Sequence, residues 1–121
     1  MTVQDIVRQF YEAFDQKNDS WQLYVAEDIV FSDASQQLHT EGKAAFIQAF
    51  SSFLPALEHI QIQQLIVEGN DACAVVSADY VSPSGRRLRQ NDAEILKVVD
   101  GKIAALTVYF DITEYRAFMA S

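Results

Sequence analysis

The sequence predicts an α+β fold in which helices come first and a meander of β-strands follows. Up to Leu54, apolar side chains recur every three or four residues, which is the spacing of amphipathic helices. From Glu58 onward they alternate or run continuously between turn sequences such as Gly69-Asn70-Asp71 and Asp100-Gly101, a pattern typical of antiparallel strands. Because helices and strands are segregated along the chain, we expect the helices to pack on one face of a single sheet.

The first predicted helix covers residues 2–17. Thr2 can cap it, with Asp5 in the capping-box position that Glu or Gln usually holds. One apolar stripe runs along this helix, with Tyr11 at its edge. The stripe consists of Val3, Ile6, Val7, Phe10 and Phe14. Such a stripe is the face that a helix buries against a sheet.

Two further helices and a short strand are predicted before the meander. A short second helix follows the break at residues 17–19 and carries Trp21. Residues 29–33 have the composition of a short strand, and residues 34–40 that of a polar loop. A third helix is predicted over residues 43–54, because Pro55 cannot continue it.

Four strands make up the predicted meander, at residues 58–67, 72–81, 86–99 and 103–110. Gln64 shifts the phase of the alternation, which predicts a β-bulge nearby. In the last strand, Leu106, Val108 and Phe110 share one face. The opposite face carries Ala105, Thr107, Tyr109 and Asp111. This division predicts a pocket with polar groups at its tip on one side of the sheet.

The composition favours one domain, residues 1–121, with a sizeable core, because 50% of the residues are hydrophobic. The formal net charge of −8 disfavours nucleic acid or an anionic membrane as a partner, since both bind basic surfaces. No apolar run approaches the ~20 residues of a membrane span, and no signal-peptide pattern is present. We therefore expect a cytoplasmic protein. Cys73 is the single cysteine, so no internal disulfide can form.

Sequence motifs for cofactors and metals are missing. The chain has no Gly-x-Gly-x-x-Gly or phosphate loop for a nucleotide. It has no His-Glu-x-x-His, and neither His39 nor His59 has partners at metal-ligand spacing. We expect neither a cofactor nor a metal.

Four segments, in this order, resemble the nuclear transport factor 2-like superfamily, and in particular its SnoaL-like and ketosteroid-isomerase-like members. The segments are residues 7–14 (VRQFYEAF), 26–33 (AEDIVFSD), 41–46 (EGKAAF), and 100–103 with 109–111 (DGKI and YFD). The resemblance implies three N-terminal helices packed in the concave face of a strongly curved, mostly antiparallel sheet. It also implies an apolar cavity that takes a small hydrophobic molecule, and a homodimer formed through the outer face of the sheet.

Three acids on otherwise apolar faces are candidates for proton transfer, because burial raises the pKa of an unpaired carboxyl group. Asp33 occupies the position of the general base in the ketosteroid isomerases that the sequence resembles, or else it caps the turn after a strand. Glu94 lies near the position of the protonated acid that donates to the oxyanion there, or else it is solvated. Asp111 ends a Tyr-Phe-Asp sequence similar to that of SnoaL-like polyketide cyclases and limonene-type epoxide hydrolases, or else it caps the segment that follows.

Two departures from the resembled families concern hydrogen-bond donors. The isomerases carry a donor Tyr on the first helix, whereas Phe10 occupies that position here and Tyr11 lies about 100° further round the helix. The epoxide hydrolases pair an Arg with a second Asp on a neighbouring strand. Here Arg89-Gln90-Asn91 supplies an Arg and an amide instead.

His39 and the aromatic residues complete the candidate site. His39 could act as a general acid or base near neutral pH, or could simply be exposed in its loop. The aromatic residues are mostly core, and a subset is expected to line the cavity and favour a flat apolar ligand. The candidates are Phe10, Tyr11, Phe14, Trp21, Tyr24, Phe31, Phe50, Phe53 and Tyr109.

The sequence leaves two functions of different classes open. The first is a cofactor-independent isomerase or cyclase, in which Asp33 or Asp111 removes a proton from an apolar carbonyl compound. Glu94, Tyr109 or His39 would then stabilise the enolate. The second is a non-catalytic module of the same fold that binds a small ligand or forms a dimer. Epoxide hydrolysis ranks third.

Overall fold

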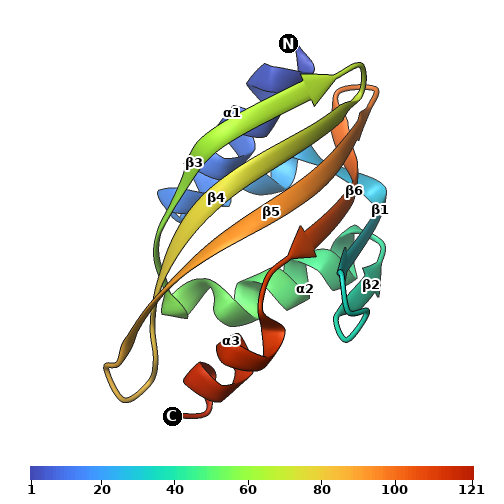
Figure 1. Ribbon diagram of the computed structural model, residues 1–121. Coiled ribbons are helices and arrows are strands. Elements are labelled where there is room, and N and C mark those ends of the chain that lie inside the picture. Colours follow the sequence, from blue (N-terminus) through green and yellow to red (C-terminus); the bar gives the residue numbers. More distant parts are fainter.

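The computed structural model describes residues 1–121 and confirms the α+β fold, with a curved, unclosed sheet and helices over its concave face (Figure 1). The sheet has six strands in the order β2-β1-β6-β5-β4-β3. The strands are β1 (Val25–Asp33), β2 (His39–Glu41), β3 (Leu57–Glu68), β4 (Asp71–Val81), β5 (Arg87–Val99) and β6 (Lys102–Tyr109). The α-helices are α1 (Val3–Asp15), α2 (Lys43–Phe53) and α3 (Ile112–Met119), and short 3₁₀ helices cover Asp19–Tyr24 and Leu54–Ala56.

The start of α1 follows the predicted capping box. The Thr2 side chain accepts from the Asp5 amide, and the Asp5 carboxylate accepts from the Thr2 amide, both at 3.1 Å. The predicted apolar stripe faces the sheet, and four of its members are buried. They are Ile6, Val7, Phe10 and Phe14. This stripe fixes α1 against β3 and β4, so that the next side chain, Tyr11, also points inward.

The meander forms as the sequence predicts. Strands β3 to β6 pair antiparallel with their chain neighbours, and only β1 and β6 pair parallel. The register of β3 on β4 shifts between Ile62 and Gln64, at the predicted bulge. Asp100 and Gly101 have φ of 51° and 77°, and positive φ at both central residues is what a type I′ hairpin turn requires.

Three elements differ from the predictions. Strand β1 begins at Val25, four residues before the predicted Ile29, because Val25 already pairs with Ile103 of β6, ahead of a register shift and the continuous pairing of residues 30–33. His39 lies in the short strand β2 and not in a loop. Strand β6 ends at Tyr109, and Asp111 is the N-cap of α3, a helix that the sequence reading missed. The predicted placement of Asp111 on a strand face is therefore wrong.

The core lies between the helices and the concave face of the sheet. Trp21 is fully buried there, with its ring edge-on to Phe14 and Phe46 at centroid distances of 5.5 and 6.0 Å. No helix is long and apolar enough to cross a membrane.

Candidate functional site

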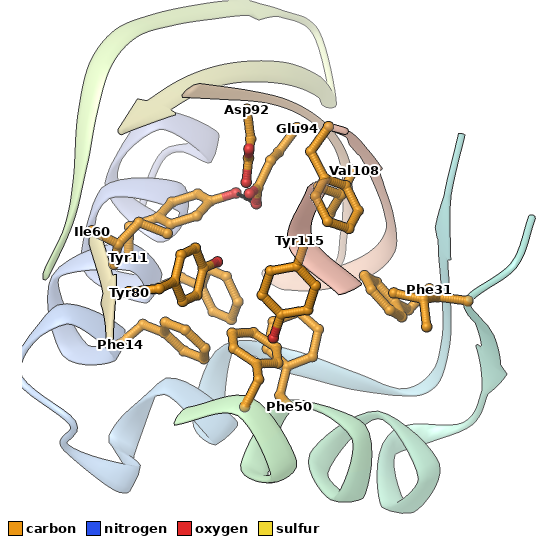
Figure 2. Close-up of a pocket in the computed structure, with 14 residues that line it drawn as sticks. Tyr11, Phe14, Phe31, Phe50, Ile60, Tyr80, Asp92, Glu94, Val108 and Tyr115 are labelled. Atoms are coloured by element: carbon orange, nitrogen blue, oxygen red, sulfur yellow. Dashed lines mark hydrogen bonds between the residues drawn. The ribbon is translucent and has the colours of Figure 1, made fainter. Parts of the chain in front are cut away.

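A cavity of about 70 Å³ lies in the aromatic core, lined by side chains of the three α-helices and of the sheet (Figure 2). It is lined by six of the aromatic residues that the sequence analysis selects, which are Phe10, Tyr11, Phe14, Phe31, Phe50 and Phe53. The remaining lining residues are Leu38, Ile60, Tyr80, Asp92, Glu94, Val108, Phe110 and Tyr115. The wall is therefore apolar except for two acids and three phenol hydroxyls.

Three of the selected aromatic residues do not line the cavity. Trp21 is packed behind it, with 0% of its surface exposed. The Tyr24 hydroxyl donates to Oε1 of Gln9 at 2.7 Å, near the protein surface. Tyr109 is 51% exposed, because alternation along β6 turns it away from the cavity-lining Val108. The polar groups of the pocket therefore do not come from the face of β6 that the sequence suggested.

Two acids of β5 supply the polar end of the cavity. Alternation along this strand places Asp92, Glu94 and Leu96 on the concave face, where all three are buried. The hydroxyl of Tyr11 donates a hydrogen bond to Oε1 of Glu94. Figure 2 shows the Asp92 and Glu94 carboxyls and the Tyr11 hydroxyl pointing toward one another. We call these three residues the acid cluster.

Burial sets the proton affinity of the acid cluster. It raises the pKa of Glu94 to about 8; the hydrogen bond from Tyr11 opposes this change, and the charge of Asp92 adds to it. Burial alone raises the pKa of Asp92 to about 6. Burial, followed by the charge of Glu94, holds the pKa of Tyr11 well above its usual range. At neutral pH, Glu94 is therefore mostly protonated, Asp92 is mostly ionised and Tyr11 keeps its proton.

Asp92 is a site residue that the sequence analysis missed. Only 5% of its surface is exposed, and its Oδ1 atom has no hydrogen-bond partner in the protein. A buried carboxylate oxygen without a partner costs free energy, and among the four buried unpaired polar atoms of the protein only this one belongs to a residue that lines the cavity. The signal was present in the sequence, because Asp92 stands two residues before Glu94 on the same strand face.

Asp33 is buried but does not line the cavity. Its Oδ1 accepts from the Leu38 amide at 2.7 Å, and its Oδ2 accepts from the amide of Ser35 at 2.8 Å and from the Ser35 hydroxyl. Burial opposes ionisation, but these hydrogen bonds outweigh it and hold the pKa of Asp33 below its usual value. The side chain thus holds the turn between β1 and β2.

Asp111, His39 and Arg89 also lie outside the cavity lining. The Asp111 carboxylate accepts from the Glu114 amide at 2.9 Å and caps α3. His39 lies 3.4 Å from the carboxylate of Glu41 in an exposed pair. Arg89 donates to Asp79 at 2.7 Å in another exposed pair. Of the four residues predicted to transfer protons, only Glu94 therefore lines the cavity. Asp33, Asp111 and His39 lie outside its lining.

Two phenols that the sequence analysis did not select enter the cavity from β4 and α3. Tyr80 and Tyr115 meet edge-on at a centroid distance of 5.3 Å, and Phe110 lies 5.8 Å from Tyr115. Tyr115 was missed because α3 was not predicted. Tyr80 was missed because its strand was taken as a continuous apolar run, although Ser77 and Asp79 alternate with Ala78 and Tyr80 and mark the opposite face as the outer one.

The polar groups that line the cavity limit the chemistry that it can perform. No group of three or more His, Cys, Asp or Glu side chains could hold a metal ion. No Lys, Arg or His lines the cavity, so it offers no counter-charge to an anionic ligand. The acid cluster does offer one ionised carboxylate beside a protonated carboxyl group, at the end of an apolar chamber. This combination can accept a proton from a neutral ligand and donate a hydrogen bond to its oxygen.

A curved sheet around helices, with a cavity in its concave face, defines the nuclear transport factor 2-like fold. Within this class the chain belongs to the SnoaL-like domain family, whose model matches residues 7–106. No curated protein sequence matches the chain significantly.

Solved structures support the fold assignment. A nuclear transport factor 2-like protein of unknown function from Burkholderia pseudomallei is similar with a TM-score of 0.86 and 14% identity, covering 100% of both chains. A protein named as a candidate SnoaL-like polyketide cyclase from Jannaschia sp. CCS1 has a TM-score of 0.83 and 14% identity, covering 98% of this chain and 92% of the other. A candidate ketosteroid isomerase from Kribbella flavida has a TM-score of 0.76 and 16% identity, covering 90% and 77%.

Proposed function

We propose that the protein is a cofactor-independent isomerase or cyclase that transfers a proton on a small hydrophobic carbonyl compound. The observation that carries this proposal is the acid cluster at the end of the aromatic cavity, in which two neighbouring carboxyl groups differ in proton affinity. Asp92 is the base, and Glu94, supported by Tyr11, is the hydrogen-bond donor. This assignment replaces Asp33 and Asp111 as the base, because their carboxyl groups lie outside the cavity lining.

The proposed reaction begins with the carbonyl oxygen of the ligand at Glu94. Tyr11 occupies Oε1 of Glu94, so the carboxyl proton resides on Oε2 and is free to donate to the ligand. Asp92 removes a proton from the carbon next to the carbonyl, which breaks a C–H bond and forms an O–H bond on Asp92. The electron pair moves into an enolate that the Glu94 hydrogen bond stabilises. Returning the proton from Asp92 to another carbon yields an isomer. In a cyclase the enolate carbon instead attacks a second carbonyl carbon, the π electrons of that carbonyl group move onto its oxygen, and this oxygen takes the proton from Asp92 as the ring closes.

Proton exchange on a simple ketone tests this proposal. The neutral bicyclic ketone 2-tetralone is incubated with the protein in D₂O, and loss of its α-protons is followed by NMR. The wild-type protein should accelerate the exchange, and Asp92→Asn should abolish the acceleration. Asp28→Asn, at an exposed position of β1, is the matched control and should retain it. Equal exchange by the wild type and Asp92→Asn would contradict the assignment of the base.

A non-catalytic ligand-binding module is the second candidate function. The same fold can also serve as a dimerisation module, and a non-catalytic role of either kind is favoured by the cavity volume of about 70 Å³, which leaves less room for a substrate than the roughly 300–1,000 Å³ of pockets that hold drug-sized ligands. Under this alternative, 2-tetralone binds without accelerated exchange. The same NMR experiment therefore separates the two functions.

The outer face of the sheet supports a homodimer. Ile66, Cys73, Ile95 and Thr107 form one row across four strands, and Val75, Ala93 and Tyr109 form the next row. Of these side chains, Ile66 is 54% exposed and Ile95 is 42% exposed. The helices leave this face uncovered (Figure 1). A two-fold dimer would bury these rows against the same rows of a second copy.

A further inference from the structure

Tyr80 brings a second polar group into the cavity, at a distance along the sheet from the acid cluster. Its side chain projects from the concave face of β4, and only 7% of its surface is exposed. Tyr115 and Phe53 pack against its ring at centroid distances of 5.3 and 6.5 Å. These contacts hold the ring in one orientation.

The hydroxyl of Tyr80 makes no hydrogen bond within the protein, and neither does that of Tyr115, whereas the hydroxyls of Tyr11 and Tyr24 donate to Glu94 and Gln9. The Tyr80 oxygen is not among the fully buried polar atoms that lack a partner, so it is accessible from the cavity. It is therefore free to donate to a ligand. Figure 2 shows the Tyr80 hydroxyl pointing into the cavity, where a ligand would lie.

The register of β4 on β5 sets the backbone of Tyr80 apart from that of the acid cluster. Asp92 pairs with Val76, which precedes Tyr80 by four residues, so the two backbone positions lie about 13 Å apart along the strand, and the Tyr80 side chain reaches into the cavity from there. Burial, together with the charges of Asp92 and Glu94, raises the pKa of Tyr80, so its hydroxyl stays protonated and can donate. The cavity thus has two polar points with aromatic walls between them.

We propose that Tyr80 is a specificity-determining residue that donates a hydrogen bond to a second oxygen atom of the ligand. This inference rests on the proposed function, which places the first oxygen at the acid cluster. The acid cluster and the Tyr80 hydroxyl together define the class of ligand that the cavity would bind. It is a neutral, flat, largely apolar compound with a carbonyl group at one end and a hydroxyl or second carbonyl group away from it. A carboxylate or phosphate is disfavoured, because no cationic side chain lines the cavity.

Matched pairs of tetralones test the role of Tyr80. Dissociation constants are measured by calorimetry for 6-hydroxy- and 7-hydroxy-2-tetralone and for the corresponding methyl compounds, which have similar size but cannot accept a hydrogen bond. The wild type should bind at least one hydroxy compound about tenfold more tightly than its methyl partner. Tyr80→Phe should reduce that ratio to below about threefold, and circular dichroism checks its fold.

The outcomes separate the role of Tyr80 from the proposed function. Equal affinities of the wild type for both members of each pair overturn the role of Tyr80, and so does a preference that survives Tyr80→Phe. A preference lost in Tyr115→Phe but kept in Tyr80→Phe overturns it too. Preference for a hydroxy compound without accelerated proton exchange contradicts the proposed enzyme function and leaves the role of Tyr80 supported. Absence of binding by every tetralone contradicts both.

Discussion

The hydroxyl of Tyr11 donates a hydrogen bond to Glu94, 83 residues further along the chain, in the buried interior of the protein. The bond joins the first helix to the central strand β5 at the polar end of an aromatic cavity. Since Glu94 is mostly protonated at neutral pH, the bond orients a carboxylic acid that can donate to a ligand.

Glu94→Gln should retain the fold and lose most of the catalysis. The amide has the shape of the protonated acid and can still accept from Tyr11, so at pH about 4, where Glu94 is largely protonated in both the folded and the unfolded chain, the free energy of unfolding should change by only about 1 kcal/mol. Because an amide is a much weaker proton donor than a carboxylic acid, exchange of 2-tetralone should fall by about 10²-fold. Chemical denaturation and NMR measure the two effects. Unchanged exchange would remove Glu94 from the reaction.

The free energy of unfolding should decrease as the pH rises, because Asp92 and Glu94 are buried and hold their protons more tightly in the folded state. Their folded-state pKa values of about 8 and about 6 lie above the ordinary 4.5 and 3.8, so the folded protein binds more protons than the unfolded chain. Their contribution is complete below pH about 4 and is lost as the pH rises through about 6 for Asp92 and about 8 for Glu94. For Glu94 it amounts to at most about 5 kcal/mol.

Denaturation at several pH values measures this effect. The free energy of unfolding of the wild type should fall between pH about 4 and pH about 8, the range over which the two acids lose their protons. The double variant Asp92→Asn/Glu94→Gln should show a flatter dependence. Parallel curves for the two proteins would mean that neither acid is perturbed by burial.

Asp33→Ala should destabilise the protein without reducing exchange. It removes the acceptor of the Ser35 and Leu38 amides, which should cost about 1–3 kcal/mol of unfolding free energy. Because the pKa of Asp33 is lowered, its stabilising contribution is present at neutral pH and is lost as the pH falls through the folded-state value. Loss of exchange at unchanged stability would instead make Asp33 the general base.

Ile95→Lys should convert the proposed dimer to monomers. The side chain lies in the middle of the outer row, and a buried lysine there would bring two like charges together across a two-fold axis. Light scattering at high micromolar concentration should give twice the chain mass for the wild type and the chain mass for the variant. Leu23→Lys, at an exposed position outside the sheet, is the control. A monomeric wild type would refute the dimer.

Local signals explain how much of the fold the sequence could reveal. The Thr2–Asp5 capping box, the Asp100-Gly101 turn and the shift near Gln64 each depend on a few neighbouring residues, and each is present in the structure. Helix α3 was missed because it has eight residues and a weak apolar stripe, so only tertiary packing stabilises it. Asp111, its N-cap, was mistaken for a strand residue for the same reason.

The site was harder to predict than the fold, because its groups meet through register and helix rotation. Tyr11 was selected as a residue of the cavity wall but not as the hydrogen-bond donor, since Phe10 held the position expected for the donor; both side chains line the cavity. Asp92 could have been found by extending the alternation from Glu94. Tyr80 could also have been found, because Ser77 and Asp79 mark the opposite face of its strand as the outer one.

The pH dependence of proton exchange tests the central claim most directly. The proposed reaction needs Asp92 ionised and Glu94 protonated, so the rate for 2-tetralone should rise through about pH 6 and fall through about pH 8. Glu94→Gln should lose the fall at high pH and keep the rise at low pH. A wild-type profile that is flat from pH 5 to pH 9, after subtraction of the buffer rate, would contradict the account.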